Sequence, residues 1–263
     1  MRVTPTLISR LAFGLALGLG TVAVRAVQVN GGTQTNDPGT PVWNYVGSLN
    51  GASGVFLGNY GGTGWVLTAG HVGAGSFTLG GTTYSSTSNS FTNFTNNSIL
   101  ADLTLFQISG TPSLANLSLA RPSVGSTVEL IGFGGGKSWG DNTIFGYSNY
   151  TLSGTSNGGP GVVTLASGLS GLGAQGVGGD SGGGLFYESS GIWYLTGILS
   201  AAGNLGSGFG NGTLAVDLSF YVSQINADIN SVSAIPEPAT QAAFCGIAIF
   251  SVVLVRRRRS NGN

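Results

Sequence analysis

Three features of the sequence predict an all-β protein. The first is composition: 41% of the 263 residues are hydrophobic and only 7% are charged, which is too apolar for a disordered chain. The second is that the apolar runs of the body are short, as in β-strands. The third is that clusters rich in glycine and asparagine, typical of turns, separate these runs. With 48 glycines, the chain has enough turn residues to join many short strands.

Two of these predicted strands carry a residue capable of acid–base chemistry. Residues 64–72, Gly-Trp-Val-Leu-Thr-Ala-Gly-His-Val, form an apolar segment that ends near His71. In residues 97–108 the side chains from Leu103 onward alternate between two faces, which predicts a strand. Asp102 opens that strand, where an ionised carboxylate is unfavourable unless it is hydrogen-bonded. Taken singly, His71 could be an ordinary structural histidine and Asp102 a turn residue.

The end of the body predicts one helix. From Asp217 onward, apolar residues recur at helical spacing, and Asp217 itself is a candidate N-cap. The apolar positions are Leu218, Tyr221, Val222, Ile225 and Ile229.

Charge excludes a nucleic-acid-binding function. The formal charge of zero conceals arginines concentrated at the two ends. Residues 27–235 hold two basic and eight acidic residues, a net charge of −6. Such a body lacks the lysines and arginines needed to neutralise phosphates. Its basic residues are Arg121 and Lys137.

Two residue types are almost absent, which excludes several chemistries. The sole cysteine, Cys245, lies outside the body, so the body has neither a disulfide nor a cysteine nucleophile. His71 is the only histidine, which excludes a multi-histidine metal site. We therefore expect no metal and no cofactor.

Residues 1–26 are predicted to be a signal peptide. Arg2 and Arg10 give a positive start, residues 11–24 are apolar, and small residues flank the position after Ala26. A first transmembrane helix is the alternative, but the run is short and rich in glycine.

Residues 234–263 resemble the PEP-CTERM sorting signal of Gram-negative bacteria. Pro236-Glu237-Pro238 precedes an apolar run over residues 242–255 and then four arginines, 256–259. Fourteen helical residues span about 21 Å, less than the roughly 30 Å hydrocarbon core of a membrane. The resemblance implies processing by an exosortase-type membrane enzyme and a location at the cell surface or outside the cell. An ordinary transmembrane anchor is the alternative reading.

The third motif of the body is Gly178-Gly179-Asp180-Ser181-Gly182-Gly183. Glycines around a serine let the backbone approach a substrate and point its amides into a concavity. Preceded by His71 and Asp102 in this order, the motif resembles the trypsin/chymotrypsin family of serine proteases. Two further segments, Gly132-Phe133-Gly134 and residues 194–200, also resemble that family.

The resemblance covers roughly residues 29–230 and implies a fold. We expect two six-stranded antiparallel β-barrels, near residues 29–121 and 122–233, with the C-terminal helix included in the second. Together they form a protease domain over residues 27–233. The active site is expected in the cleft between the barrels.

The resemblance also implies a mechanism. Ser181 attacks the scissile carbonyl, His71 accepts its proton, and Asp102 orients His71. The backbone N–H groups of Gly179 and Ser181 form the oxyanion hole. An acyl-enzyme intermediate and a protein or peptide substrate follow from this chemistry.

Asp180 has a different role in the resemblance, as partner of the mature N-terminal α-amino group. The matching N-terminal sequence here is Val29-Asn30-Gly31-Gly32. Cleavage after Ala26 would leave Val27 and Gln28 in front of it. Either a second cleavage exposes Val29 or Asp180 has another partner.

The same resemblance predicts the substrate-binding residues Gln175, Ser200 and Gly203. Gln175 is expected at the base of the primary specificity pocket, where trypsin-like members have an aspartate. Because glutamine carries no charge, we predict that the enzyme does not prefer arginine or lysine.

Two rival functions exist. A catalytically idle surface module with this fold fits the composition, but all three triad residues are present. An esterase with a Gly-x-Ser-x-Gly motif places its serine before its histidine, whereas here the only histidine comes first.

Overall fold

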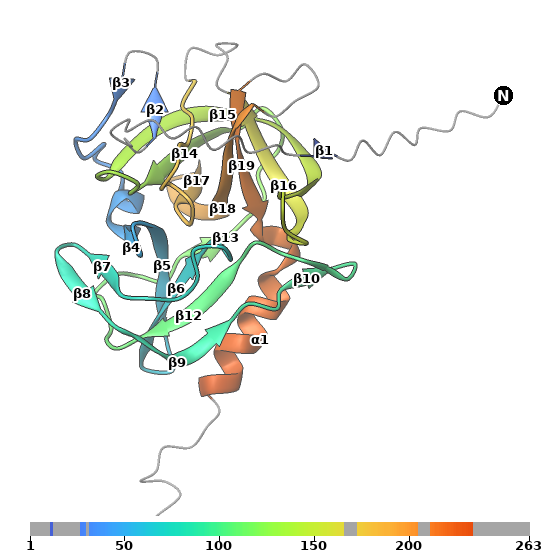
Figure 1. Ribbon diagram of the computed structural model, residues 1–263. Helices are drawn as coiled ribbons and strands as arrows, with labels where there is room; N and C mark the ends of the chain where they lie inside the picture. The colour runs from blue at the N-terminus through green and yellow to red at the C-terminus, as the bar shows by residue number, and fades with distance from the viewer. Residues whose placement is uncertain (1–10, 13–26, 30–31, 166–172, 205–210, 234–263) are drawn as a thin grey trace, which may run out of the picture.

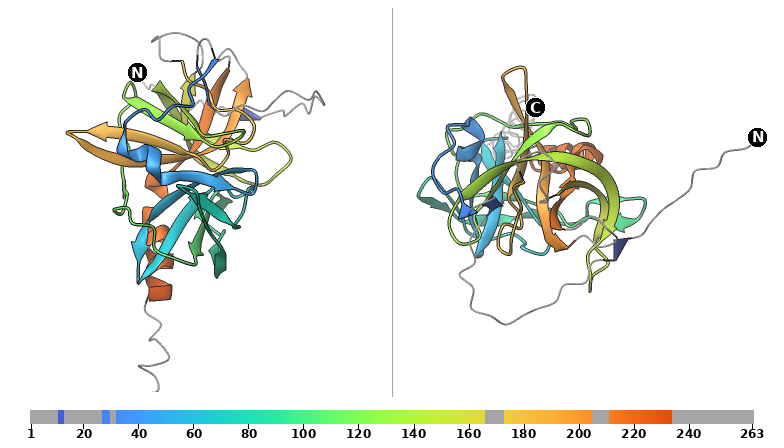
Figure 2. Two further views of the ribbon diagram at one scale, coloured as in Figure 1. Left: turned by 90° about the vertical axis from the view of Figure 1, so that its left-hand side faces the viewer. Right: turned by 90° about the horizontal axis from the view of Figure 1, so that it is seen from above.

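The computed structural model describes residues 11–12, 27–29, 32–165, 173–204 and 211–233. It confirms the all-β class: two curled sheets lie one above the other, and helix α1 runs beside the lower one (Figures 1 and 2). Most of the predicted signal peptide and the whole predicted sorting segment lie outside the described residues. The trypsin-like double-barrel fold is therefore the architecture of the body.

The first sheet has seven strands and holds the predicted histidine and aspartate segments. Every neighbouring pair in it is antiparallel. In sheet order the strands are β8 (Thr82–Tyr84), β7 (Phe77–Leu79), β4 (Val46–Leu49), β5 (Ala52–Tyr60), β6 (Thr63–Thr68), β12 (Thr104–Ile108) and β9 (Ser86–Phe91).

The second sheet contains a closed ring of six strands, because β15 pairs with both β14 and β16. Two short strands add to it in parallel and were not predicted: β13 (Ser118–Leu119) on β18 and β1 (Leu11–Ala12) on β15. The ring consists of β14 (Thr127–Gly132), β15 (Ser138–Thr151), β16 (Gly158–Leu165), β17 (Gly184–Ser189), β18 (Ile192–Asn204) and β19 (Asn211–Asp217).

Glycine pairs explain why the chain reverses so tightly. The β5–β6 hairpin turns at Gly61-Gly62, with φ of 60° and 81°. Positive φ at both positions is the requirement of a two-residue turn that matches the twist of its strands. The turn composition that predicted the all-β class is thus used directly in the hairpins.

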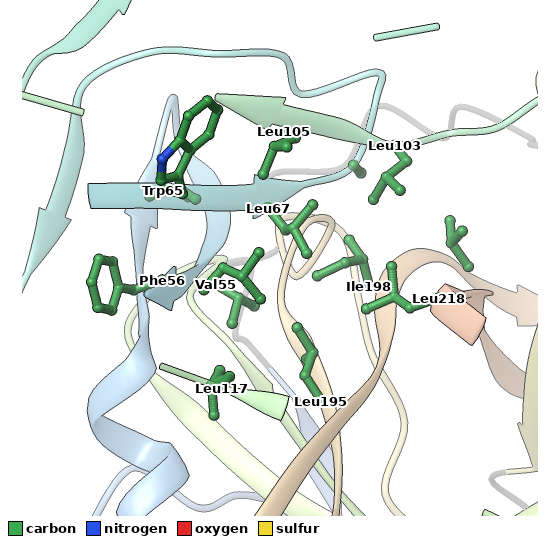
Figure 3. Packing of buried hydrophobic residues seen from close by; sticks show 14 of the residues in the cluster. Val55, Phe56, Trp65, Leu67, Leu103, Leu105, Leu117, Leu195, Ile198 and Leu218 are labelled. Carbon is green, nitrogen blue, oxygen red and sulfur yellow. The ribbon is translucent and has the colours of Figure 1, made fainter. Parts of the chain in front are cut away.

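A shared hydrophobic core holds the two sheets together. Figure 3 shows Val55 and Leu67 of the first sheet packed towards Leu195 and Ile198 of the second. All four side chains are fully buried. Since burial of such side chains contributes roughly 1.5–3 kcal/mol each, this contact fixes the first sheet on the second and shapes the cleft between them.

The predicted helix is confirmed as α1 (Val222–Ser233). It begins later than Asp217, which instead caps the 3₁₀ turn η2 (Leu218–Phe220) by accepting a hydrogen bond from the Ser219 N–H. Asp217 also accepts a hydrogen bond from Arg121 at 2.9 Å. This pair ties the link between the sheets to the start of the helix.

The remaining elements are short. The 3₁₀ turn η1 (Pro41–Tyr45) leads into the first sheet, and two small ribbons lie outside the main sheets. They are β2 (Gln28–Val29) with β3 (Gly32–Thr33), and β10 (Thr95–Asn96) with β11 (Ile99–Leu100).

Candidate active site

The end of β6 positions His71. Val66, Leu67 and Ala69 are fully buried, so the strand is anchored up to the turn that carries the histidine. At Gly70 an added Cβ would lie 2.9 Å from the Leu103 amide nitrogen and 3.1 Å from Asp102 Oδ1. The glycine therefore allows the His71 turn to pack directly against the aspartate.

Asp102 is fully buried and receives its hydrogen bonds from donors of the site. Its carboxylate accepts hydrogen bonds from the His71 backbone N–H at 2.9 Å and from His71 Nδ1 at 2.9 Å to Oδ2. The Ser200 hydroxyl donates to the same Oδ2 at 2.6 Å. These bonds supply what a buried carboxylate needs, and they leave His71 Nε2 as the ring nitrogen that can accept a proton.

The same contacts set the protonation of His71. The hydrogen bond to Asp102 raises the pKa of His71 above its usual 6.5, burial lowers it in part, and the charge of Asp102 raises it further. A buried carboxylate at hydrogen-bond distance favours the imidazolium over the imidazole. His71 can therefore hold a proton that it receives during a reaction.

The loop that carries Ser181 has a glycine on each side in the left-handed region, Gly179 with φ of 94° and Gly182 with φ of 84°. At Gly179 an added Cβ would lie 2.5 Å from the Cα of Gly134, and at Gly182 it would lie 2.0 Å from the Ser53 carbonyl oxygen. The Gly132-Phe133-Gly134 segment and strand β5 thus press on the loop from two sides. Only glycine fits both conformation and space.

The backbone amides predicted to form the oxyanion hole are available. Within the described ranges, neither the Gly179 N–H nor the Ser181 N–H donates a hydrogen bond to the protein. The neighbouring amides are engaged: Asp180 donates to the Val177 carbonyl and Gly182 to the Leu199 carbonyl. Two amides that have no protein acceptor in the described ranges, one on each side of Asp180, are what an oxyanion requires.

A cavity of about 320 Å³ brings the predicted residues together. His71, Ser181 and Ser200 all line it, although they come from different elements. In the described part of the chain His71 and Ser181 make no hydrogen bond to each other, and such bonds often tighten only when substrate binds. The other lining residues are Leu152, Ser153, Thr155, Gly176, Val177, Gly178, Asp180, Leu199, Ala201, Ala202 and Thr213.

Some lining residues carried no signal in the sequence. Leu152, Ser153 and Thr155 belong to the turn between β15 and β16, and only the pairing of those strands brings them to the cavity. Their residue types are ordinary for a loop. Sequence reasoning had no means of selecting them.

Gln175 and Gly203 are not among the residues that line this cavity, although their chain neighbours Gly176 and Ala202 are. The Gln175 backbone pairs with Gln28, with both N–H to carbonyl distances at 2.8 Å. The corresponding part of the lining is made by Gly176, Ala202 and Thr213. The Gly176 N–H donates to Thr213 Oγ1 at 2.8 Å, which fixes a hydroxyl and a methyl group at this end of the cavity.

Asp180 belongs to the loop that carries Ser181 and is 1% exposed. It accepts hydrogen bonds from the Val177 N–H at 2.8 Å and the Gly134 N–H at 3.4 Å, and also from the Val27 N–H. Burial raises the pKa of Asp180 to about 7, and the three amides oppose that shift only in part. Within the described part of the chain, the donors to Asp180 are neutral amides and none of them carries a positive charge.

Residues 29–223 match the trypsin family, and the chain belongs to that family. Its members act on proteins or peptides, so a protease is the class of protein that the sequence match and the fold define. Compared with curated proteins, the sequence has no match.

Solved structures support the fold. The chain is similar to the inactive form of Rv3671c from M. tuberculosis, a serine-to-alanine mutant, with 18% identity and a TM-score of 0.53, covering 78% of this chain and 98% of that one. A second structure of the Rv3671c protease gives 17% identity and a TM-score of 0.52, covering 74% and 98%. Kallikrein-related peptidase 10 gives 22% identity and a TM-score of 0.49, covering 72% and 97%. At these identities, the two Rv3671c structures, with TM-scores above 0.5, show a common fold alone.

Two kinds of feature are absent from the described residues. None of the helices there is long and apolar enough to span a membrane. In the same ranges, His, Cys, Asp and Glu residues form no group of three that could hold a metal ion.

Proposed function

We propose that this chain is a serine endopeptidase with His71, Asp102 and Ser181 as its catalytic triad. The observation that carries this proposal is the buried Asp102 carboxylate, which is hydrogen-bonded to His71 Nδ1. This bond leaves His71 Nε2 as the nitrogen that can accept a proton from Ser181. His71 shares one cavity with Ser181. An idle module would have no need to keep a buried carboxylate bonded to a partly exposed histidine.

Each group has a defined step in the proposed reaction. Ser181 Oγ attacks the peptide carbonyl while His71 Nε2 takes its proton, and the Gly179 and Ser181 N–H groups bind the developing oxyanion. His71 then gives the proton to the leaving amine, which departs and leaves an acyl group on Ser181. Water then attacks this ester while His71 takes its proton; the carboxylic acid product leaves, and His71 returns the proton to Ser181 Oγ, which restores the free serine. Asp102 stabilises the imidazolium in both halves.

The lining favours an uncharged side chain before the scissile bond. Among its described members Asp180 is the one carboxylate, and backbone amides already occupy it. A guanidinium or ammonium group would therefore be desolvated without a counterion. Thr213 and Ala202 fill the end of the cavity next to Gly176, which favours small residues over large ones.

The surroundings of Asp180 support a proposal for the first residue of the mature chain. Val27 is fully buried and its backbone nitrogen already donates to Asp180. Cleavage after Ala26 would turn this neutral amide into an α-ammonium group, which supplies the missing cation. We therefore propose Val27 as the N-terminal partner of Asp180, rather than Val29.

N-terminal sequencing of the active exported protein tests this assignment. We expect it to begin at Val27. An active form that begins at Val29 would contradict the assignment.

Export is part of the same proposal. The leader of residues 1–26 directs the chain across a membrane, and the segment 234–263 is recognised by an exosortase-type enzyme of a Gram-negative bacterium. The body then acts at the cell surface or outside the cell. Its substrates are proteins or peptides in that space.

The direct test of function is hydrolysis by the exported protein. The purified protein is incubated with unfolded casein, and a Ser181→Ala variant purified in the same way serves as the control. We expect new peptide amino termini with the native protein and none above background with the variant. Equal release by both proteins, or no release by either, would contradict the proposal.

A further inference from the structure

Ser53 is a buried polar residue that connects three parts of the molecule. It lies in β5 of the first sheet, directly opposite Ser48 of β4, and is 0% exposed. Both its backbone and its side chain are hydrogen-bonded outside the sheet. Serine is a small polar residue that is usually found at the surface, so its complete burial here calls for a reason.

The contacts of Ser53 converge on the nucleophile loop. Its backbone N–H donates to the Ser181 carbonyl at 2.9 Å, and its hydroxyl donates to the Gly179 carbonyl at 3.2 Å. The same Oγ accepts a hydrogen bond from the Phe133 N–H at 2.7 Å. One residue of the first sheet thus holds the carbonyls of both residues whose amides are proposed to bind the oxyanion.

A held carbonyl fixes the orientation of its peptide plane. The Gly179 carbonyl belongs to the plane that joins Gly179 to Asp180, and Gly179 has no side chain to limit its rotation. Gly179 already adopts φ of 94°, a conformation that glycine enters and leaves easily. The hydroxyl of Ser53 restrains this plane and thereby limits rotation at the Gly179 Cα, to which the Gly179 N–H group is also attached.

The bond from Phe133 sets the position of the hydroxyl itself. Because the Phe133 N–H occupies a lone pair of Ser53 Oγ, the Oγ–H is left to donate to Gly179. The Thr68 hydroxyl donates to the Ser53 carbonyl at 2.8 Å and fixes the Ser53 backbone. Hydrogen bonds thus fix both the backbone and the hydroxyl of Ser53, as expected of a residue that positions the Gly179 carbonyl.

We propose that Ser53 is a positioning residue for the oxyanion hole, acting through Gly179 and Ser181 without touching substrate. This inference rests on the proposed serine endopeptidase function. The Ser53 side chain matters because it connects the Gly132-Phe133-Gly134 segment to the loop that carries Ser181. The first sheet thereby controls an oxyanion site built from the backbone of the second.

The test is the Ser53→Ala variant of the full chain, which keeps the backbone N–H but removes the hydroxyl. We expect kcat for a peptide substrate to fall about tenfold, with KM changed less than about twofold, because the lost restraint matters in the transition state. Affinity for a peptide boronate, which mimics the tetrahedral intermediate, should fall by a similar factor. The pH at half-maximal activity should not move, since His71 and Asp102 are untouched.

Ser48→Ala is the matched control. It makes the same chemical change directly across the ladder, and in the described residues the Ser48 side chain makes no hydrogen bond. We expect its kcat and boronate affinity to match the native protein. Thermal unfolding of both variants shows whether a loss of activity comes from unfolding or from misplaced oxyanion-hole amides.

Ser53→Cys provides a second variant if Ser53→Ala does not fold. Its thiol is a weaker hydrogen-bond donor than a hydroxyl. We therefore expect kcat and boronate affinity both to be lower than in the native protein, by similar factors. Native kcat and boronate affinity in a folded Ser53 variant would overturn the inference, as would a raised KM with kcat unchanged. If the native protein itself does not react with a fluorophosphonate at Ser181, the proposed function fails instead.

Discussion

The two sheets contribute different kinds of chemical group to the site. The first sheet supplies side chains, His71 just after β6 and Asp102 just before β12, each held by buried apolar neighbours in the same strand. The second sheet supplies the loop before β17, where Ser181, the proposed nucleophile, lies among glycines and the groups proposed to bind the oxyanion are backbone amides. Side chains are positioned by the strand that carries them, whereas backbone amides are positioned by whatever packs against the loop.

This difference predicts how each half of the site fails. Replacing His71 or Asp102 in the first sheet should abolish catalysis while leaving the fold intact. A substitution in the glycine loop should disturb the fold and the chemistry together.

The largest expected effect is on the side-chain half. We predict that Asp102→Asn lowers kcat/KM about 10⁴-fold, because the amide can hold His71 in the wrong tautomer. The unfolding temperature should change by only a few degrees, since the asparagine side chain has nearly the same shape and would keep most of the packing. Steady-state kinetics and thermal unfolding of the same preparation measure both. A loss of less than about tenfold would show that Asp102 is not the orienting carboxylate.

The backbone half is tested at Gly182. In Gly182→Ala the new Cβ would meet the Ser53 carbonyl and the Thr68 hydroxyl at about 2 Å with φ still near 84°. We predict destabilisation of at least about 3 kcal/mol and loss of activity together. Denaturant unfolding gives the stability.

Gly191→Ala is the matched control for that substitution. Gly191 has φ of 78°, but nothing lies within 4 Å of an added Cβ. Only the conformational cost applies, about 1–2 kcal/mol, and activity should remain. Equal destabilisation at both positions would show that the contact with the first sheet does not matter.

A smaller effect is expected at the end of the cavity. Thr213→Gly removes the methyl and hydroxyl groups beside Gly176 and enlarges the cavity. We compare kcat/KM for substrates with a large uncharged residue before the scissile bond with kcat/KM for substrates with alanine at that position. We predict that this ratio rises about tenfold or more in the variant, because the substitution opens space for one or two methylene groups. A peptide library measures the ratio. An unchanged ratio would show that the specificity pocket lies elsewhere. A strong preference of the native protein for arginine or lysine would contradict the prediction that the pocket binds uncharged side chains.

The smallest effect is a shift in the titration of His71. Because its pKa is raised in the folded protein, the pair with Asp102 stabilises the fold below about pH 6.5, and this contribution disappears as pH rises through the raised pKa. Activity follows the opposite course, since the reaction needs neutral imidazole and should fall as pH drops through that same value. His71 is the only histidine, so a single imidazole signal reports its titration by NMR. In Asp102→Asn the midpoint should fall, and an unchanged midpoint would contradict the assigned cause.

The side-chain half of the candidate site has a signal in the sequence, whereas the backbone half has little. His71, Asp102 and Ser181 stand in short motifs whose residue types carry the chemistry, and the structure places them around one cavity or within hydrogen-bond reach. Ser53 lies in a strand with nothing to distinguish it from other serines. Its importance comes from contacts with residues far along the chain, Phe133 and Gly179, which no local pattern contains.

The helix and the N-terminal partner show the same limit. Helical periodicity predicted α1, but the sequence did not show that Asp217 caps a 3₁₀ turn before it. The family pattern left open whether Val29 or another group is the partner of Asp180, and the fully buried residue whose backbone bonds to Asp180 is Val27. Periodicity is a local property, whereas the fit of a chain end into a buried site depends on the tertiary structure.

The measurement that tests the central claim most directly is covalent labelling of the exported protein with a fluorophosphonate, followed by mass spectrometry of its peptides. A serine is phosphonylated by such a reagent only when a base and oxyanion donors activate it. We predict one modified residue, Ser181, and no modification in the His71→Ala variant at the same protein concentration. Labelling of another residue, or equal labelling of Ser181 without His71, would contradict the triad.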